Sequence, residues 1–173
     1  MVQTLYGILA MSMLALLTLT LNNSIHSNDQ EMMMNEISSH VTGMADELFD
    51  EISGLSYDSA TLSDQNLVTR DVLSDEETFG TENCEPENNF SGCWVMNDLH
   101  GATMEHTIGG ITYHMEISLR YVDESDPTQD SSTPTFSKMA EIRISSPDLY
   151  IGSSSNPLTV VLDRLYNYPR VTG

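Results

Sequence analysis

The chain has 173 residues, which suits one globular domain with one additional element. It carries 26 acidic and 6 basic residues, giving a formal net charge of −20 at pH 7. That charge repels nucleic acid phosphates and anionic lipid head groups, so it argues against proteins that bind DNA, RNA or acidic membrane surfaces. The acidic excess suits either a repulsive surface that resists aggregation or an adaptation to high salt.

The first segment, residues 2–21, has no charged residue and is mostly apolar. As a helix it would be about 30 Å long, which matches the hydrocarbon core of a bilayer. It has neither the basic flank nor the small-residue cleavage site of a secretory signal peptide. We therefore expect that a short basic leader has been removed before Met1, the alternative being that Met1 is the initiator. The residues expected to be covered by lipid or by other helices are Leu5, Ile8, Leu9, Met13, Leu14, Leu16, Leu17, Leu19 and Leu21.

Helical spacing continues in residues 32–55, where apolar residues recur at steps of three and four. The pattern predicts one helix over residues 1–55, with a terminal stop at Gly54 and a loosened or unwound polar stretch at residues 22–31. Its second half should pack on a sheet, and a membrane tether with a coiled-coil stalk is the alternative. The packing stripe is expected to be Ile37, Val41, Met44, Leu48 and Ile52.

Two cysteines, Cys84 and Cys93, are the only ones in the chain. In an exported protein they are expected to form a disulfide. The alternative is a metal site completed by His100 or His106, although the cysteine spacing lacks the paired C-x-x-C geometry of zinc sites. Asn89 begins an N-x-S sequon and is a candidate for glycosylation.

The most regular strand signal lies in residues 111–123, where apolar and polar residues alternate. Gly109 and Gly110 suit a turn from a preceding strand. One helix against a small antiparallel sheet, with the sheet domain in residues 56–173, predicts an α+β architecture. The other strands are expected near residues 102–108, 136–145 and 158–165.

Motifs for catalysis are absent from the sequence, including G-x-S-x-G, H-E-x-x-H and a Gly-rich phosphate loop. We therefore expect a protein that is not an enzyme and has no cofactor. An acidic loop after the long strand offers oxygen ligands for calcium, but it lacks EF-hand spacing, so an ordinary solvated turn is the favoured interpretation. Its carboxylates are Asp123, Glu124, Asp126 and Asp130.

Three sequence features together resemble bacterial type IV pilins and pilin-like proteins, including pseudopilins. The chain starts with an apolar block that continues into an amphipathic helix. The end of that helix, residues 45–61, resembles the helix ends of minor-pilin-like proteins. The succession of residues 97–101, 121–127 and 134–147 resembles the sheet region of pilin-like proteins.

This resemblance implies a pilin-like fold and a structural subunit of an extracellular type IV pilus-like filament. Such subunits are processed by a prepilin peptidase, wait in the inner membrane, and are added by assembly machinery to a helical homopolymer at the cell surface. The chain departs from the family at its start, since Met1 and Leu5 replace the usual Phe and Glu. A pseudopilin of a type II secretion-like machine and a membrane-anchored extracellular binding domain are the alternatives.

Overall fold

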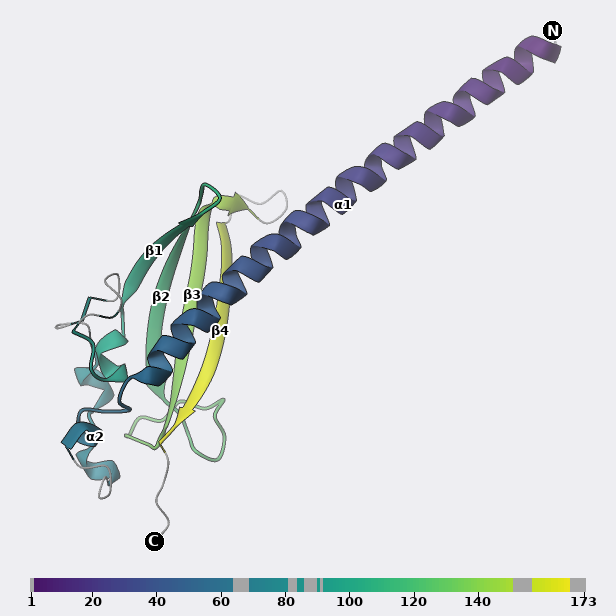
Figure 1. The fold of residues 1–173 in the computed structure, drawn as a ribbon. Helices are drawn as coiled ribbons and strands as arrows, with labels where there is room; N and C mark the ends of the chain where they lie inside the picture. The colour runs from purple at the N-terminus through teal and green to yellow at the C-terminus, as the bar shows by residue number, and fades with distance from the viewer. Residues whose placement is uncertain are drawn as a thin grey trace. The chain divides into compact units, whose positions relative to one another are not determined.

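A computed structural model describes residues 2–63, 69–80, 84–85, 90, 92–150 and 157–168. The chain forms two compact units, Met1–Gly43 and Met44–Gly173. A long helix and an antiparallel sheet confirm the predicted α+β class. In chain order the elements are α1 (Val2–Gly54), α2 (Ala60–Ser63), η1 (Arg70–Val72), η2 (Glu76–Thr78), η4 (Met96–Leu99), β1 (Thr103–Ile108), β2 (Ile111–Tyr121), β3 (Ser137–Tyr150) and β4 (Pro157–Asn167) (Figure 1).

Helix α1 continues without a break through residues 22–31, so the expected loosening of that stretch is wrong. The helix contains no proline, and glycine occurs within it only at Gly7 and Gly43 before the terminal Gly54. Nothing in this stretch therefore removes a backbone hydrogen bond or breaks the helix. A polar side chain is compatible with the helix as long as it reaches solvent or bonds back to a carbonyl of the preceding turn.

The apolar start of α1 is described only in part. Among the described residues, no helix combines the length and the apolar character that crossing a membrane requires. The transmembrane helix expected at residues 2–21 includes side chains outside the described residues and stays a prediction. The side chains of Leu5, Ile8 and Leu9 lie outside the described residues.

The sheet contains the strands in the order β1-β2-β3-β4, and all neighbours are antiparallel. The β1–β2 hairpin turns at Gly109 and Gly110, whose φ angles are 60° and 84°. Both angles lie in the left-handed region, which glycine adopts without steric cost and which two-residue hairpin turns need. The predicted turn is therefore confirmed. Strand β3 extends beyond the predicted residues 136–145, as far as Tyr150.

The core of the second unit lies between the sheet and the last turns of α1. From Tyr113 onward, every second residue of β2 is buried, as its alternating sequence predicts. From the helix, Met44, Leu48 and Ile52 are buried. The other two residues of the expected stripe, Ile37 and Val41, are also buried and belong to the first unit. The buried residues of β2 are Tyr113, Met115, Ile117, Leu119 and Tyr121.

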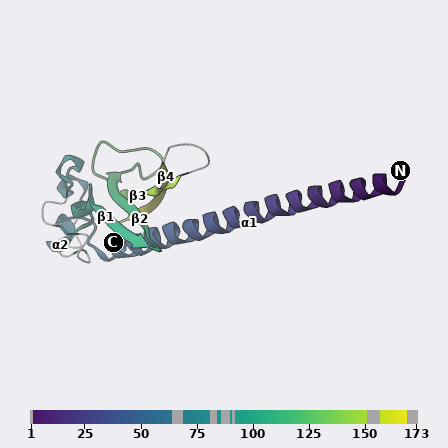
Figure 2. The same ribbon diagram turned by 90° about the horizontal axis from the view of Figure 1, so that it is seen from above.

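Strand β4 holds the last turns of α1 through polar contacts. The Tyr166 hydroxyl donates a hydrogen bond to the Phe49 carbonyl oxygen at 2.6 Å. The Arg164 guanidinium binds the Asp46 and Asp50 carboxylates, each at 2.9 Å. Figures 1 and 2 both show these turns on one face of the sheet. The helix end is thus fixed by apolar burial and by hydrogen bonds to one strand.

Ile52 tests this packing, because its side chain is fully buried. We expect Ile52→Ala to lower the free energy of unfolding by about 2–5 kcal/mol, since it removes apolar burial and leaves a cavity. Chemical denaturation followed by circular dichroism measures this loss. The matched control is Glu51→Ala on the exposed side of the same turn, with an expected change within about 0.5 kcal/mol. Equal small losses for both variants would contradict the packing.

Candidate functional site

The first candidate site is the exposed apolar surface of α1. Consecutive side chains lie about 100° apart around a helix, so the leucines at positions 14, 16, 17, 19 and 21 point in several directions. No single neighbouring element covers such a set. The exposed apolar residues, from 47% exposed at Met34 to 78% at Met11, are Met11, Met13, Leu14, Leu16, Leu17, Leu19, Leu21, Ile25, Met32, Met33 and Met34.

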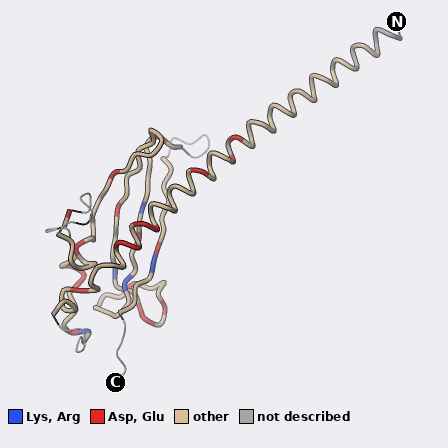
Figure 3. The backbone as a smooth tube through the Cα atoms, in the orientation of Figure 1, with Lys and Arg blue, Asp and Glu red and all other residues tan. Residues whose placement is uncertain are grey.

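Charge is absent from the helix before Asp29. The first acidic residue of the chain is Asp29 and the first basic residue is Arg70. Figure 3 shows acidic residues along the later part of α1 and in the loops of the second unit. Copies of residues 10–25 can therefore approach one another without repulsion between charged side chains.

The two cysteines form the predicted disulfide, which closes a short loop at Cys84 and Cys93. The alternative metal site is wrong for these residues, because a disulfide sulfur is not a thiolate ligand. His100 is hydrogen-bonded to the backbone instead, because its Nδ1 accepts a hydrogen bond from the Leu119 amide at 3.0 Å. Among the described residues, no group of three or more His, Cys, Asp or Glu side chains is placed to hold a metal ion. The candidate glycosylation residue Asn89 lies outside the described residues.

The acidic loop after β2 uses its carboxylates for its own structure. Asp123 accepts hydrogen bonds from the amide and the hydroxyl of Ser125, and these bonds lower the pKa of the Asp123 carboxyl. Asp126 accepts equivalent bonds from a threonine two residues later. Glu124 and Asp130 each pair with an arginine, at 2.8 Å and 2.7 Å. These contacts are those of a solvated turn, the interpretation favoured over calcium.

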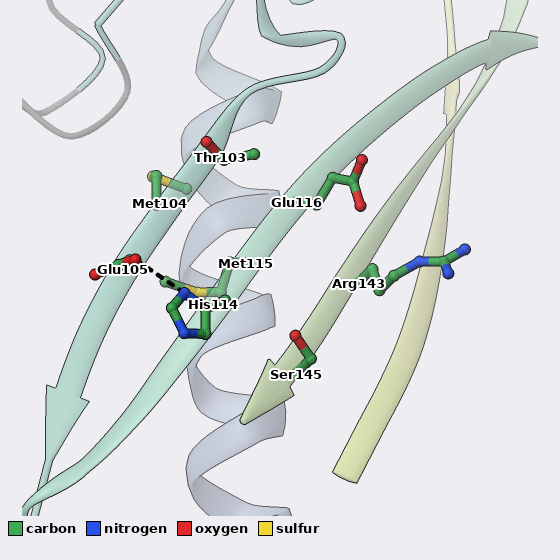
Figure 4. A pocket seen from close by; sticks show the side chains of 8 residues that line it. All are labelled: Thr103, Met104, Glu105, His114, Met115, Glu116, Arg143 and Ser145. Carbon is green, nitrogen blue, oxygen red and sulfur yellow. Dashed lines mark ion pairs between the residues drawn. The ribbon is translucent and has the colours of Figure 1, made fainter. Parts of the chain in front are cut away.

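A polar pocket of about 280 Å³ lies on strands β1, β2 and β3 (Figure 4). Within it, His114 Nδ1 and Glu105 Oε1 are 3.0 Å apart. Arg143 extends away from this pair (Figure 4) and contacts Glu141 at 3.2 Å. Both members of the Glu105–His114 pair are largely exposed, and exposed pairs contribute about 1 kcal/mol or less. We assign no function to this pocket.

The second candidate site surrounds Lys138, the only lysine in the chain, which is fully buried at the start of β3. Its Nζ donates hydrogen bonds to Asn97 Oδ1 at 2.5 Å and to the Tyr57 carbonyl oxygen at 2.7 Å. A third bond reaches Asp58 Oδ2 at 3.2 Å. An ammonium has three N–H donors, so each donor has an oxygen acceptor.

Three aromatic rings enclose the same nitrogen. The ring centres of Tyr57, Tyr121 and Phe79 lie 4.2, 4.9 and 5.1 Å from Lys138 Nζ. Ring faces attract a cation and at the same time exclude water from it. Tyr57 is the third residue after α1, Tyr121 ends β2 and Phe79 directly follows η2. The site therefore joins segments that are distant in the sequence.

Asp58 is the counter-charge of the cluster and is also fully buried. Its Oδ2 accepts hydrogen bonds from Asn97 Nδ2 at 2.9 Å and from the Tyr121 hydroxyl at 3.2 Å. Its Oδ1 accepts bonds from the Ser74 hydroxyl at 2.9 Å and the Ala60 amide at 3.2 Å. A buried carboxylate needs partners of this kind, because an unpaired one is costly.

Burial and pairing shift the pKa values of Lys138 and Asp58 in opposite directions. Burial lowers the pKa of Lys138 to about 8, although the Asp58 carboxylate opposes this shift. For Asp58, burial alone raises the pKa, but Lys138 and the hydrogen bonds from Asn97, Ala60 and Ser74 outweigh it and lower the pKa overall. Burial also raises the pKa of the Tyr57 and Tyr121 hydroxyls, which stay protonated.

The sequence analysis missed this cluster, although one signal for it was present. Alternate residues share one face of a strand, so Lys138 lies on the same face of the predicted strand as Ala140, Ile142 and Ile144. The solitary lysine therefore belongs to the apolar face, where a charge needs a partner. The identity of that partner had no local signal, because Asp58 lies 80 positions away and Asn97 lies 41 positions away.

Comparisons with known proteins found no matching family model, no matching curated protein and no matching solved structure. The function is therefore inferred from the residues and their contacts.

The buried carboxylate provides a test of the cluster. We expect Asp58→Ala to lower the free energy of unfolding by about 3–5 kcal/mol, because it leaves the Lys138 charge without its counter-charge. Denaturant titration measures the loss. The control is Asp75→Ala, which removes an exposed acid nearby and should change stability by about 0.5 kcal/mol or less. If both variants lost the same small amount, net charge rather than the buried pair would decide stability.

Proposed function

We propose that this chain is a structural subunit of an extracellular type IV pilus-like filament, in which the α1 helices of many copies cover one another. The observation that carries the proposal is the exposed apolar surface that extends around α1 in the first unit. The resemblance of the sequence to pilin-like proteins supports the same conclusion. The second unit, with its folded sheet and acidic residues, would form the outer part of such a filament.

Several copies suit this helix better than one partner does. A helix with a single apolar stripe is satisfied by one neighbour, whereas a helix that is apolar on all sides needs neighbours all round. Full burial of a leucine side chain contributes about 1.5–3 kcal/mol. Many such side chains on each copy make lateral association strongly favourable. Uncharged residues 10–25 add no electrostatic cost to that association.

The acidic residues limit where copies can attract one another. A formal charge of −20 on each chain makes contact between other surfaces unfavourable. Attraction is then confined to the uncharged part of α1, which favours an ordered polymer over a random aggregate. The role is structural and needs no cofactor and no enzymatic turnover of a substrate.

The route to the filament follows from the resemblance and stays a prediction. Subunits would be held at the inner membrane, processed by a prepilin peptidase and polymerised by pilus assembly machinery at the cell surface. No contact among the described residues favours a pseudopilin or a membrane-anchored binding domain over the filament subunit. Short assemblies would point to the pseudopilin, and stable monomers to the binding domain.

Assembly of the full chain tests the proposal. The protein is purified in mild detergent, the detergent is removed, and polymer is measured by sedimentation and electron microscopy. We expect wild-type chain to form long filaments and Leu14→Asp to reduce sedimented polymer at least about tenfold, because a charge would be buried among apolar helices. Leu16→Asp should have the same effect.

The matched control is Leu14→Met, which keeps the apolar character and nearly the volume of the side chain. It should assemble as wild type does. Circular dichroism and thermal unfolding of Leu14→Asp should match wild type, since the substitution lies outside the second unit. Wild-type chain that stays monomeric, or Leu14→Asp that assembles normally, would refute the helix-core filament.

A further inference from the structure

We propose that the buried cluster forms a covalent cross-link, an isopeptide bond between Lys138 Nζ and the side-chain carbonyl carbon Cγ of Asn97, with Asp58 transferring the protons. The reaction is a single self-modification of the folded chain. It is independent of filament assembly and goes beyond it.

The nucleophile and the electrophile are already in contact. Lys138 Nζ lies 2.5 Å from Asn97 Oδ1. A carbonyl bond is about 1.23 Å long, so Nζ lies within about 3.7 Å of Cγ. Reacting atoms in productive complexes are about 3–3.5 Å apart. The terminal torsion of an asparagine is broad, so a small turn of the amide presents Cγ to the nitrogen lone pair.

Asp58 occupies the position that a proton-transfer group needs. Its Oδ2 lies 3.2 Å from Lys138 Nζ, the attacking nitrogen, and 2.9 Å from Asn97 Nδ2, the leaving nitrogen. One carboxylate oxygen therefore contacts both nitrogens whose protonation must change. A base within hydrogen-bond reach of a nucleophile is the arrangement that activates it. These two bonds also fix the asparagine amide with its oxygen toward the lysine.

The surroundings favour the neutral amine that the attack requires. Burial lowers the pKa of Lys138 to about 8, so the neutral form is accessible near neutral pH. Lys138 and Asp58 are both fully buried, and three aromatic rings stand around Nζ. Exclusion of water strengthens the electrostatic contacts and protects the product amide from hydrolysis.

The reaction balances without any added reagent. The Lys138 ammonium gives one proton to the Asp58 carboxylate, and the lone pair of Nζ then forms a bond to Asn97 Cγ. Asp58 protonates Nδ2, the Cγ–Nδ2 bond breaks with its electron pair on nitrogen, and ammonia leaves. One of the two protons still on Nζ then passes to Asp58 and the other stays as the amide N–H, which leaves a neutral amide and a neutral carboxylic acid. Nothing is oxidised or reduced.

Asn97 is a better acyl partner than Asp58. Its oxygen is the nearer one, at 2.5 Å against 3.2 Å for Asp58. A carboxylate that carries negative charge is also a poor electrophile, and both Asp58 oxygens accept several hydrogen bonds. The two partners give different products, because attack on Asn97 releases ammonia and attack on Asp58 releases water. Mass spectrometry separates these outcomes.

The cross-link would close a ring between η4 and β3. Asn97 and Lys138 are 41 positions apart, and the hairpin of β1 and β2 lies between them. A covalent ring of this kind restricts the unfolded chain in the same way as a disulfide, but it survives reducing conditions.

The test is the mass of the full chain, purified after folding and with its disulfide reduced. We expect a mass about 17 Da below the sequence value, the mass of one ammonia. Trypsin should then fail to cut after Lys138 and should release residues 71–120 joined to residues 121–143. Lys138→Met and Asp58→Asn should both have the full sequence mass, and in Asp58→Asn trypsin should cut after Lys138.

Each alternative result overturns a defined part of the proposal. Full sequence mass in the wild-type chain refutes the cross-link, and this result does not depend on the folding of any variant. A loss of about 18 Da with Lys138 joined to Asp58 refutes the assignment to Asn97. Ammonia loss with a normal tryptic cut after Lys138 indicates cyclisation of an asparagine on its own backbone and also refutes it. Ammonia loss with the joined peptides in Asp58→Asn refutes the role of Asp58.

Discussion

Lys138 and Asp58 place opposite charges in the interior of the second unit, where an unpaired charge costs several kilocalories per mole. That cost makes the segments around them interdependent. Asp58 lies four residues after α1, Asn97 belongs to η4, Tyr121 ends β2 and Lys138 is the second residue of β3. Each of these segments supplies a group that another one needs, so the loops reach their positions only when the sheet and the helix end are both formed. The pair therefore links loop structure to the completion of the core.

The two units satisfy different physical requirements. The second unit buries its apolar side chains within itself, between the sheet and the last turns of α1. The first unit leaves leucines and methionines exposed, and apolar patches of this kind commonly mark contact surfaces. Charge is also unevenly placed, because the chain has no acidic residue before Asp29. One chain thus contains a folded core and an exposed apolar surface suited to contact with neighbours.

The elements that were predictable from sequence are those set by local patterns. Alternation in residues 111–121 predicted β2, and Gly109-Gly110 predicted the turn before it. The polar stretch at residues 22–31 was misjudged, because a helix tolerates polar residues wherever neither proline nor glycine interrupts it. The Lys138 cluster was missed for another reason. Its members lie in separate segments, and only the register of β2 with β3 and the path of the loops bring them together.

The edge strands of the sheet, β1 and β4, affect how closely packed copies of the chain can interact. β1 is short, and it exposes Glu105 and His106, while β4 begins with a proline, which has no amide to donate. A charged edge discourages the strand of one molecule from extending the sheet of another, and the proline removes one backbone donor at the start of the opposite edge. Dense packing of these units would therefore leave each sheet separate, and cohesion between molecules would reside in helical contacts, which can slide and rearrange more readily than a shared ladder of backbone hydrogen bonds.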